Sequence, residues 1–156
     1  MRLFLTIAAT WGGLGYFPVA SGTVGTLGAI PLYLALSRLS LPLYLVTVVA
    51  FTLLACRVSG DAETIFGEKD SGKIVIDEVA GFLVTMTGVA QAFPEPRQAV
   101  PALIAGFLFF RLFDIVKPPP ARFFDQKLKN GYGVVLDDIA AGVYACAATH
   151  LVLRLL

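Results

Sequence analysis

Long apolar runs separated by short polar or glycine-rich stretches dominate this sequence. No charged residue lies between Arg2 and Arg38, and the following run, 39–56, is also uncharged. Apolar runs of 13 to 18 residues are too long for typical strands, and several are shorter than the roughly 20 residues of an upright membrane span. The pattern therefore predicts an all-α fold, with apolar helices over 23–37, 39–56, 79–93, 99–116 and 134–156.

Glycines, prolines and charged residues separate these helices. A short apolar helix and a glycine-rich loop are expected before residue 23, and 94–97 is expected to form a turn. The prolines 118–120 end the run 99–116, because the residue before a proline is disfavoured in the α conformation. The segment 57–77 is a polar stretch, and 121–133 is expected to be a polar loop. We expect one domain over 1–156, a compact bundle of about six helices with roughly four or five membrane-embedded segments.

Composition supports a membrane protein. Hydrophobic residues make up 57% of the chain and charged residues 15%, whereas soluble domains carry about 25% charged residues. The formal net charge of +1 provides no field that would attract nucleic acid, so no nucleic-acid partner is expected. Cys56 and Cys146 each lie inside an apolar run and are expected to be small buried side chains rather than a redox pair.

The helix order also predicts how the polar segments are distributed between the two membrane faces. We call the face that carries 57–77 side A and the opposite face side B. The runs 23–37 and 39–56 then form a hairpin that turns at Arg38 on side B, and the runs 79–93 and 99–116 form a second one. Eight Lys and Arg residues fall on side A and three on side B, which predicts a cytoplasmic side A. Side A carries Arg2, Arg57, Lys69, Lys73, Lys117, Arg122, Lys127 and Lys129, and side B carries Arg38, Arg97 and Arg154.

Two adjacent acid pairs lie where apolar runs begin. Asp77 and Glu78 precede the run 79–93, and Asp137 and Asp138 lie within the last predicted helix. Carboxylates beside lipid are costly, and oxygen-only ligand sets suit hard cations such as Mg²⁺. We therefore predict that the four carboxylates bind Mg²⁺. Two alternatives remain. Asp77 and Glu78 could have the structural role of stabilising a helix N-terminus and no metal role, and Asp137 and Asp138 could be a solvated pair at a helix start.

A third polar group ends the run 99–116. Arg111, Asp114 and Lys117 follow one another at intervals of three, so they share one side of a helix. A guanidinium and an ammonium suit phosphate oxygens, and the carboxylate can orient the guanidinium or complete a metal shell. These residues are our candidates for catalysis and, for the two cations, for phosphate binding. The alternative is an intramembrane ion pair with a lysine that extends to the interface.

The glycine-rich segment before the second helix is a further candidate. Gly22 and Thr23 lie among glycines and hydroxyl residues, a composition typical of loops whose backbone N–H groups bind phosphate. The alternative is that Ser21 or Thr23 caps the helix. With both acid pairs and the segment 111–117, this loop falls on side A, so we expect these distant segments to meet at one membrane boundary.

The missing residue types narrow the chemistry. The chain has one histidine, His150, so a histidine phosphatase and a zinc cluster of histidines are excluded. Metal-assisted attack by water remains. A non-enzymatic membrane module, such as a small ion-transport subunit, is the alternative from another class. It would distribute polar residues through the membrane depth, whereas here they collect on one side. An alcohol-phosphate transferase of the CDP-alcohol type would need an array of helical acids that the sequence lacks.

Four sequence blocks together resemble the phosphatidylglycerophosphatase A family. They are PVASGTVGT (18–26), KIVIDEVAG (73–81), FRLFDIVKPPP (110–120) and GYGVVLDDIAAGVYA (131–145), in this order. The resemblance implies a Mg²⁺-dependent phosphatase of the bacterial inner membrane that converts phosphatidylglycerophosphate to phosphatidylglycerol and phosphate. It also implies a helical bundle in which one central helix is surrounded by others. The oligomeric state does not follow from the sequence.

Overall fold

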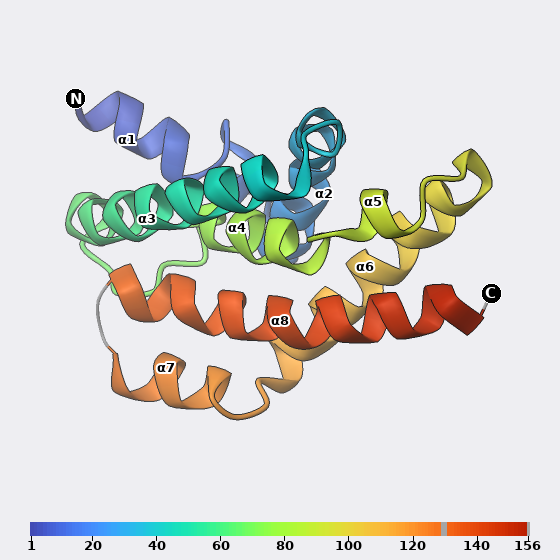
Figure 1. Ribbon diagram of the computed structural model, residues 1–156. Coiled ribbons are helices and arrows are strands. Elements are labelled where there is room, and N and C mark those ends of the chain that lie inside the picture. Colours follow the sequence, from blue (N-terminus) through green and yellow to red (C-terminus); the bar gives the residue numbers. More distant parts are fainter. Residues whose placement is uncertain (129–130, 156) are drawn as a thin grey trace.

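The computed structural model describes residues 1–128 and 131–155, and these residues form helices joined by turns and loops, without a strand (Figure 1). The all-helical prediction is therefore confirmed. The helices are α1 (Arg2–Ala9), the 3-10 helix η1 (Leu14–Tyr16), α2 (Ser21–Leu36), α3 (Leu41–Phe66), α4 (Ile76–Thr85), α5 (Val89–Ala92), α6 (Pro96–Val116), α7 (Ala121–Lys127) and α8 (Gly131–Leu155).

The short helix α4 lies at the centre of the bundle and packs against α2, α3, α6 and α8 (Figure 1). Most of its side chains are fully buried, among them Phe82 and Leu83. The phenol hydroxyl of Tyr44, on α3, donates a buried hydrogen bond to the Leu83 carbonyl at 2.7 Å. A central helix surrounded by others is the arrangement that the family resemblance implied.

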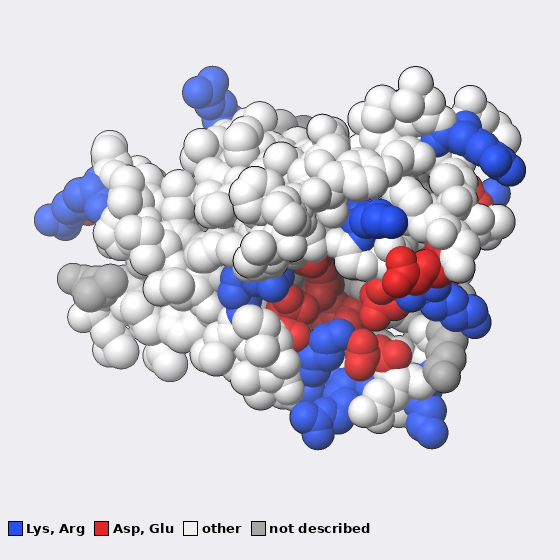
Figure 2. All heavy atoms as spheres, turned by 180° about the vertical axis from the view of Figure 1, so that it is seen from behind, with Lys and Arg blue, Asp and Glu red and all other residues white. Residues whose placement is uncertain are grey.

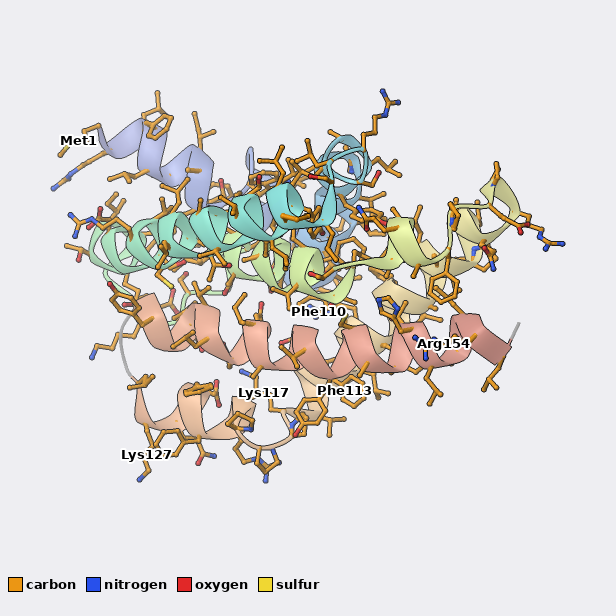
Figure 3. The ribbon with its side chains drawn as sticks, viewed as in Figure 1. Met1, Phe110, Phe113, Lys117, Lys127 and Arg154 are labelled. Atoms are coloured by element: carbon orange, nitrogen blue, oxygen red, sulfur yellow. The ribbon has the colours of Figure 1, made fainter. Side chains whose placement is uncertain are left out.

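Small residues allow α4 and α8 to approach closely. A Cβ atom at Gly81 would lie 2.6 Å from the Phe110 ring and 2.8 Å from the backbone oxygen of Asp138. Figure 3 shows Phe110 between α4 and α8. A glycine at position 81 therefore sets the distance between the two helices that carry the acid pairs.

Three helices, α3, α6 and α8, are long and apolar enough to cross a membrane. Helix α2 is apolar but shorter, and α4, with 10 residues, is about 15 Å long, half of a typical hydrocarbon core. The predicted helix 79–93 was therefore wrong in its extent. It is split into α4 and α5 at Gly88, whose φ of 74° lies in the left-handed region.

Two polar segments contain more helix than the sequence analysis predicted. Helix α3 continues to Phe66, so residues 57–66, which include the charged Arg57, Asp61 and Glu63, extend a membrane helix beyond its apolar part. Most of the predicted loop 121–133 is also helical, because α7 occupies its first half and α8 begins at Gly131. Lys129, which we counted on side A, and residue 156, the end of the last predicted helix, lie outside the described residues.

The segments assigned to side A do come together. The loop before α4 contacts the glycine-rich segment, since Ser21 Oγ donates to the Gly72 carbonyl at 2.6 Å. It also contacts the end of α1, where the Val75 N–H donates to the Ala9 carbonyl at 2.9 Å. Figure 1 shows the last turns of α3 beside the beginnings of α4 and α8. Lys117 lies near the first half of α8 and Arg154 at its far end (Figure 3).

Candidate active site

Three carboxylates from α4 and α8 form a compact group. Asp77 and Glu78 lie in the first turn of α4, and Asp138 lies in the first third of α8. One oxygen from each carboxylate falls within 4.8 Å of the others. Asp77 is 7% exposed and Asp138 4% exposed, so water does not compensate their charges. We call Asp77, Glu78 and Asp138 the acid cluster.

The donor set of the acid cluster suits a divalent cation. Among the described residues, Asp77 Oδ1, Glu78 Oε2 and Asp138 Oδ2 are buried and accept no hydrogen bond. Buried carboxylate oxygens without a partner are costly, because each has lost its water without gaining a donor. Oxygen ligands in a close group are those that Mg²⁺ prefers in proteins. The residues present therefore fit a hard cation.

Burial and mutual repulsion change the acidity of the pair on α4. Burial raises the pKa of Asp77 well above its ordinary value, and the neighbouring charge of Glu78 raises it further. Burial also raises the pKa of Glu78, although a hydrogen bond from Asp77 and the charge of Arg111 partly offset the effect. Without a bound cation the pair therefore favours proton uptake, and a cation would compete with those protons.

Arg111 connects the acid cluster to α6. Its Nη1 lies 2.7 Å from Asp114 Oδ2, and both side chains are mostly buried, at 17% and 14% exposure. Its Nε is buried and has no hydrogen-bond partner among the described residues, so the guanidinium retains a donor for a ligand oxygen. Figure 2 shows the Asp and Glu side chains in a recess of the surface, with Lys and Arg side chains around it.

Gly22 is the member of the glycine-rich segment that reaches this site. A Cβ atom there would overlap the Glu78 carboxylate and lie 3.2 Å from Arg111 Nη1. The first turn of α2 therefore packs directly against two predicted site residues. Within the described part of the chain, Thr23 makes no side-chain hydrogen bond, and no side chain caps α2. The alternative of a capping Ser21 or Thr23 is thus wrong, and a phosphate-binding role for Gly22 and Thr23 stays a prediction.

Asp137 lies apart from the acid cluster. Its Oδ2 accepts a hydrogen bond from Lys117 Nζ at 2.6 Å, and the same ammonium donates to Asp125 Oδ1 at 2.7 Å. Burial lowers the pKa of Lys117, but these two carboxylates outweigh it and raise the pKa overall. Adjacent aspartates on a helix point about 100° apart, which explains why Asp137 and Asp138 have different partners. A metal-ligand role for Asp137 stays a prediction.

The sequence analysis missed Asp125. It placed 121–133 in a polar loop, whereas α7 brings the Asp125 carboxylate to Lys117. A signal was present, because Asp125 is the single acid between Asp114 and Asp137, in a segment rich in Lys and Arg. A lysine buried beside a membrane requires a counter-charge, and Asp125 was the nearest unassigned acid that follows it in the chain.

Comparisons with known proteins identify the family of the chain. A family model described as Phosphatidylglycerophosphatase A matches residues 7–153. The chain is 36% identical to Phosphatidylglycerophosphatase A of Haemophilus influenzae over 134 residues, which are 85% of this chain and 78% of that protein. It is 31% identical to Phosphatidylglycerophosphatase A of Escherichia coli over 140 residues, which are 90% of this chain and 78% of that protein.

A third relative has a different name. The chain is 36% identical over 139 residues to a Bacteroides thetaiotaomicron protein provisionally named a phosphatidylinositol-3-phosphatase, covering 85% of this chain and 83% of that protein. No solved structure matches the chain. The three relatives are named for phosphatase activity on phospholipids that end in a phosphate.

Proposed function

This chain belongs to the phosphatidylglycerophosphatase A family, and we propose on that premise that it hydrolyses phosphatidylglycerophosphate to phosphatidylglycerol and phosphate. The reaction would serve phospholipid biosynthesis in the bacterial inner membrane. The proposal rests on the acid cluster next to Arg111. Its buried carboxylate oxygens accept no hydrogen bond among the described residues, and the neighbouring Arg111 Nε has an N–H that is not used in a hydrogen bond.

The acid cluster would bind Mg²⁺, with Asp77, Glu78 and Asp138 as protein ligands. When bound, Mg²⁺ supplies a positive charge that stabilises the charge developing on the phosphate and on the leaving oxygen. Gly22 allows the first turn of α2 to approach Glu78, and this contact helps to fix that carboxylate. Preorganised ligands need no rearrangement during the reaction, which is the usual advantage of such a site.

Arg111 and Lys117 would bind the terminal phosphate of the lipid. The carboxylate of Asp114 orients the guanidinium at 2.7 Å and leaves the Arg111 Nε donor available. The Lys117 ammonium has three N–H donors, and Asp125 and Asp137 take two of them, so one donor remains for a phosphate oxygen. In hydrolysis, an oxygen of water bonds to phosphorus while the bond from phosphorus to the glycerol oxygen breaks, and that oxygen takes a proton.

The arrangement also supports a location at a membrane surface. The acid cluster and Lys117 lie toward one end of the bundle, near the beginnings of α4 and α8, so the lipid tails could remain in the membrane while the head group reacts. The excess of Lys and Arg on this end suggests that it faces the cytoplasm. A transport subunit would need polar groups along the full depth of the spanning helices, and relatives named as phosphatases favour the enzyme.

Release of phosphate from detergent-solubilised phosphatidylglycerophosphate tests the proposal. We expect activity with Mg²⁺, loss of activity with EDTA, and recovery on adding Mg²⁺ in excess. Asp138→Asn removes one ligand charge at nearly constant volume, and we expect a loss of at least about 100-fold, because a cluster ligand acts directly on the metal. Asp61→Asn is the matched control, since Asp61 lies outside the cluster and forms an ion pair with Arg57, whose side chain is 79% exposed.

A second substrate distinguishes head-group selection from general lipid phosphatase activity. Phosphatidylinositol 3-phosphate also ends in a phosphate monoester, and the Bacteroides thetaiotaomicron relative is provisionally named for this substrate class. We expect faster turnover of phosphatidylglycerophosphate. Equal or faster turnover of the inositol lipid would reassign the substrate. Full activity of Asp138→Asn on both lipids would refute the role of the acid cluster.

A further inference from the structure

A pocket lies toward the other end of α6 from Arg111, between the end of α2, α5 and the beginning of α6. Its volume is about 150 Å³, and we call it the distal pocket. Its lining includes Tyr33, Leu34, Val89, Phe93, Ala99 and Leu103. The proposed reaction uses none of these residues.

The described lining of the distal pocket suits hydrocarbon rather than a polar ligand. Its two residues with aliphatic polar side chains, Ser37 and Glu95, already have partners. Ser37 Oγ donates to the Leu34 carbonyl at 2.9 Å, and Glu95 Oε2 lies 2.6 Å from Arg97 Nε. The other described lining residues are apolar or aromatic. An apolar cavity of about 150 Å³ can hold a hydrocarbon the size of benzene, so the pocket has room for the end of an acyl chain.

Helices α2 and α6 connect the distal pocket to the candidate active site. A Cβ atom at Gly22 would lie 3.2 Å from Arg111 Nη1, so the beginning of α2 meets the second half of α6. Leu34 and Leu103 line the distal pocket together, so the end of α2 meets the first half of α6. The two helices therefore run beside each other in opposite directions, from the site to the pocket.

The side of α6 that carries Arg111 is apolar between the site and the pocket. Leu103, Phe107 and Arg111 follow one another at intervals of four, so they share one side of the helix. Leu103 and Phe107 are partly buried against the core and place hydrocarbon between the pocket and the guanidinium. A lipid whose phosphate binds Arg111 would therefore have an apolar surface beside its chain.

The distance from the site to the pocket matches one acyl chain. Leu103 lies about 12 Å before Arg111 along α6, and Leu34 lies about 18 Å after Gly22 along α2, at the usual helical rise. The hydrocarbon core of a membrane is about 30 Å thick, so a chain in one leaflet extends about 15 Å from its head group. A phosphate at Arg111 therefore places the end of a chain at the distal pocket.

Another apolar groove, between α6 and α8, is not aligned with Arg111. Its lining includes Phe109, which is two positions from Arg111 and therefore about 160° away around α6. The Tyr144 hydroxyl, on α8, donates to the Pro119 carbonyl at 2.7 Å, and the Tyr144 ring contacts Phe113. These contacts join α8 to the end of α6 on the side A end of the groove. The distal pocket is thus the better placed of the two for a chain whose phosphate binds Arg111.

We propose that the distal pocket and the adjoining surfaces of α2 and α6 bind one acyl chain of the lipid substrate. The inference rests on the proposed function, which places the phosphate at Arg111, and adds a site for the apolar part of the same molecule. Because lipid tails are as apolar as the pocket, the chain gains contact with ordered side chains rather than escape from water. The pocket therefore acts on the selection and orientation of the substrate, and short-chain lipids lack its contacts.

Photocrosslinking tests the inference without relying on turnover. The probe is phosphatidylglycerophosphate with a diazirine at the end of one palmitoyl chain, added to the native protein in detergent and irradiated at once. We expect crosslinks within 33–37 and 99–103, located by mass spectrometry, and their loss in excess unlabelled lipid. Crosslinks spread evenly over the exposed faces of α3, α6 and α8 would indicate bulk lipid contact and overturn the inference.

A variant that fills the pocket tests its effect on substrate selection. The measurement is kcat/KM for dipalmitoyl relative to dihexanoyl phosphatidylglycerophosphate in the same detergent. We expect a ratio of at least about ten for the native protein, the lower end of the discrimination that an apolar pocket gives for one methylene. Ala99→Phe fills the pocket from an exposed position and should lower the ratio toward one.

The matched control makes the same substitution elsewhere on α6. Ala105 lines the groove between α6 and α8, so Ala105→Phe should keep the native ratio. Circular dichroism and thermal unfolding verify the fold of both variants. If Ala99→Phe keeps the native ratio, or Ala105→Phe lowers it as much, the chain does not lie in the distal pocket and the inference is overturned. If the native protein releases no phosphate from either lipid, the proposed function fails instead.

Discussion

Lys117 offers the most informative single perturbation, because one ammonium joins the end of α6 to α7 and α8. Lys117→Met keeps the length of the side chain and removes both charge-assisted hydrogen bonds, at 2.6 Å to Asp137 and 2.7 Å to Asp125. Asp137, with 7% of its side chain exposed, would then carry an uncompensated charge. Asp125 is 31% exposed, so water can compensate much of its loss.

The structure gives the size of the effect. Removing one partner of a buried ion pair costs about 3–5 kcal/mol, and the partial exposure of Lys117 reduces this to about 2–3 kcal/mol. For a chain of this length, 1 kcal/mol shifts the melting temperature by about 2–4 °C, so we expect a decrease of roughly 5–10 °C. The double variant Lys117→Met with Asp137→Asn removes the stranded charge and should recover most of this loss.

Thermal unfolding of the detergent-solubilised protein provides the stability measurement, and phosphate release provides the activity. Arg57→Met is the control, because its pair with Asp61 is 3.3 Å long and the arginine side chain is 79% exposed, so it should cost less than about 1 kcal/mol. If Lys117 binds phosphate, the double variant regains stability while its turnover stays about 10–100-fold below that of the native protein. Unchanged melting of Lys117→Met, or no recovery in the double variant, would refute the reasoning.

Three further predictions concern the acid cluster and its supports. Gly22→Ala should displace Glu78 and lower turnover by at least about tenfold with little change in melting. Gly72→Ala should leave both unchanged, because its Cβ would lie 4.0 Å from Ser21 Oγ, an ordinary van der Waals contact. Gly81→Ala places a Cβ 2.8 Å from a backbone oxygen of α8. We expect this overpacking to lower the free energy of unfolding by about 1–3 kcal/mol, and to lower both the melting temperature and the turnover. Because the folded pKa values of Asp77 and Glu78 are raised, the metal-free folded state binds more protons than the unfolded chain. The stability of the metal-free protein should therefore fall as the pH rises from about 4 through the folded pKa values, so EDTA-treated protein should melt at a higher temperature at pH 5 than at pH 7.5. Asp77→Asn should reduce that difference in melting temperature. If the native protein shows no such difference, the assignment of raised pKa values is contradicted.

The bundle was largely predictable, because the length of apolar runs is a local property. Helices α2, α3, α6 and α8 lie where uncharged or weakly charged runs predicted them, within a few residues at most ends. The extension of α3 through Arg57 and Asp61 was not predictable from hydropathy, since a polar helix above a membrane and a polar loop have similar composition. The end of α4 at Thr85 was missed for a similar reason, because the run 79–93 stays apolar across the break.

The candidate site was predicted in outline and corrected in detail. The order of the predicted helices across the membrane placed both acid pairs and the segment 111–117 on side A, and the structure brings them together at one end of the bundle. The sequence could not assign partners within this group. Whether Asp137 or Asp138 joins Asp77 depends on the rotation of α8 about its axis, and packing against α4 sets that rotation.

The sequence by itself determined the all-helical class, the membrane character and the residue types of the site, because hydrophobic burial and charge depend on local composition. Only the tertiary structure decided which oxygens remain without donors and that Asp125 shares Lys117 with Asp137. It also decided that the contacts of Gly22 and Gly81 are tight. These features depend on distances between helices that are remote in sequence, and such distances follow from the packing of whole side chains rather than from any one segment.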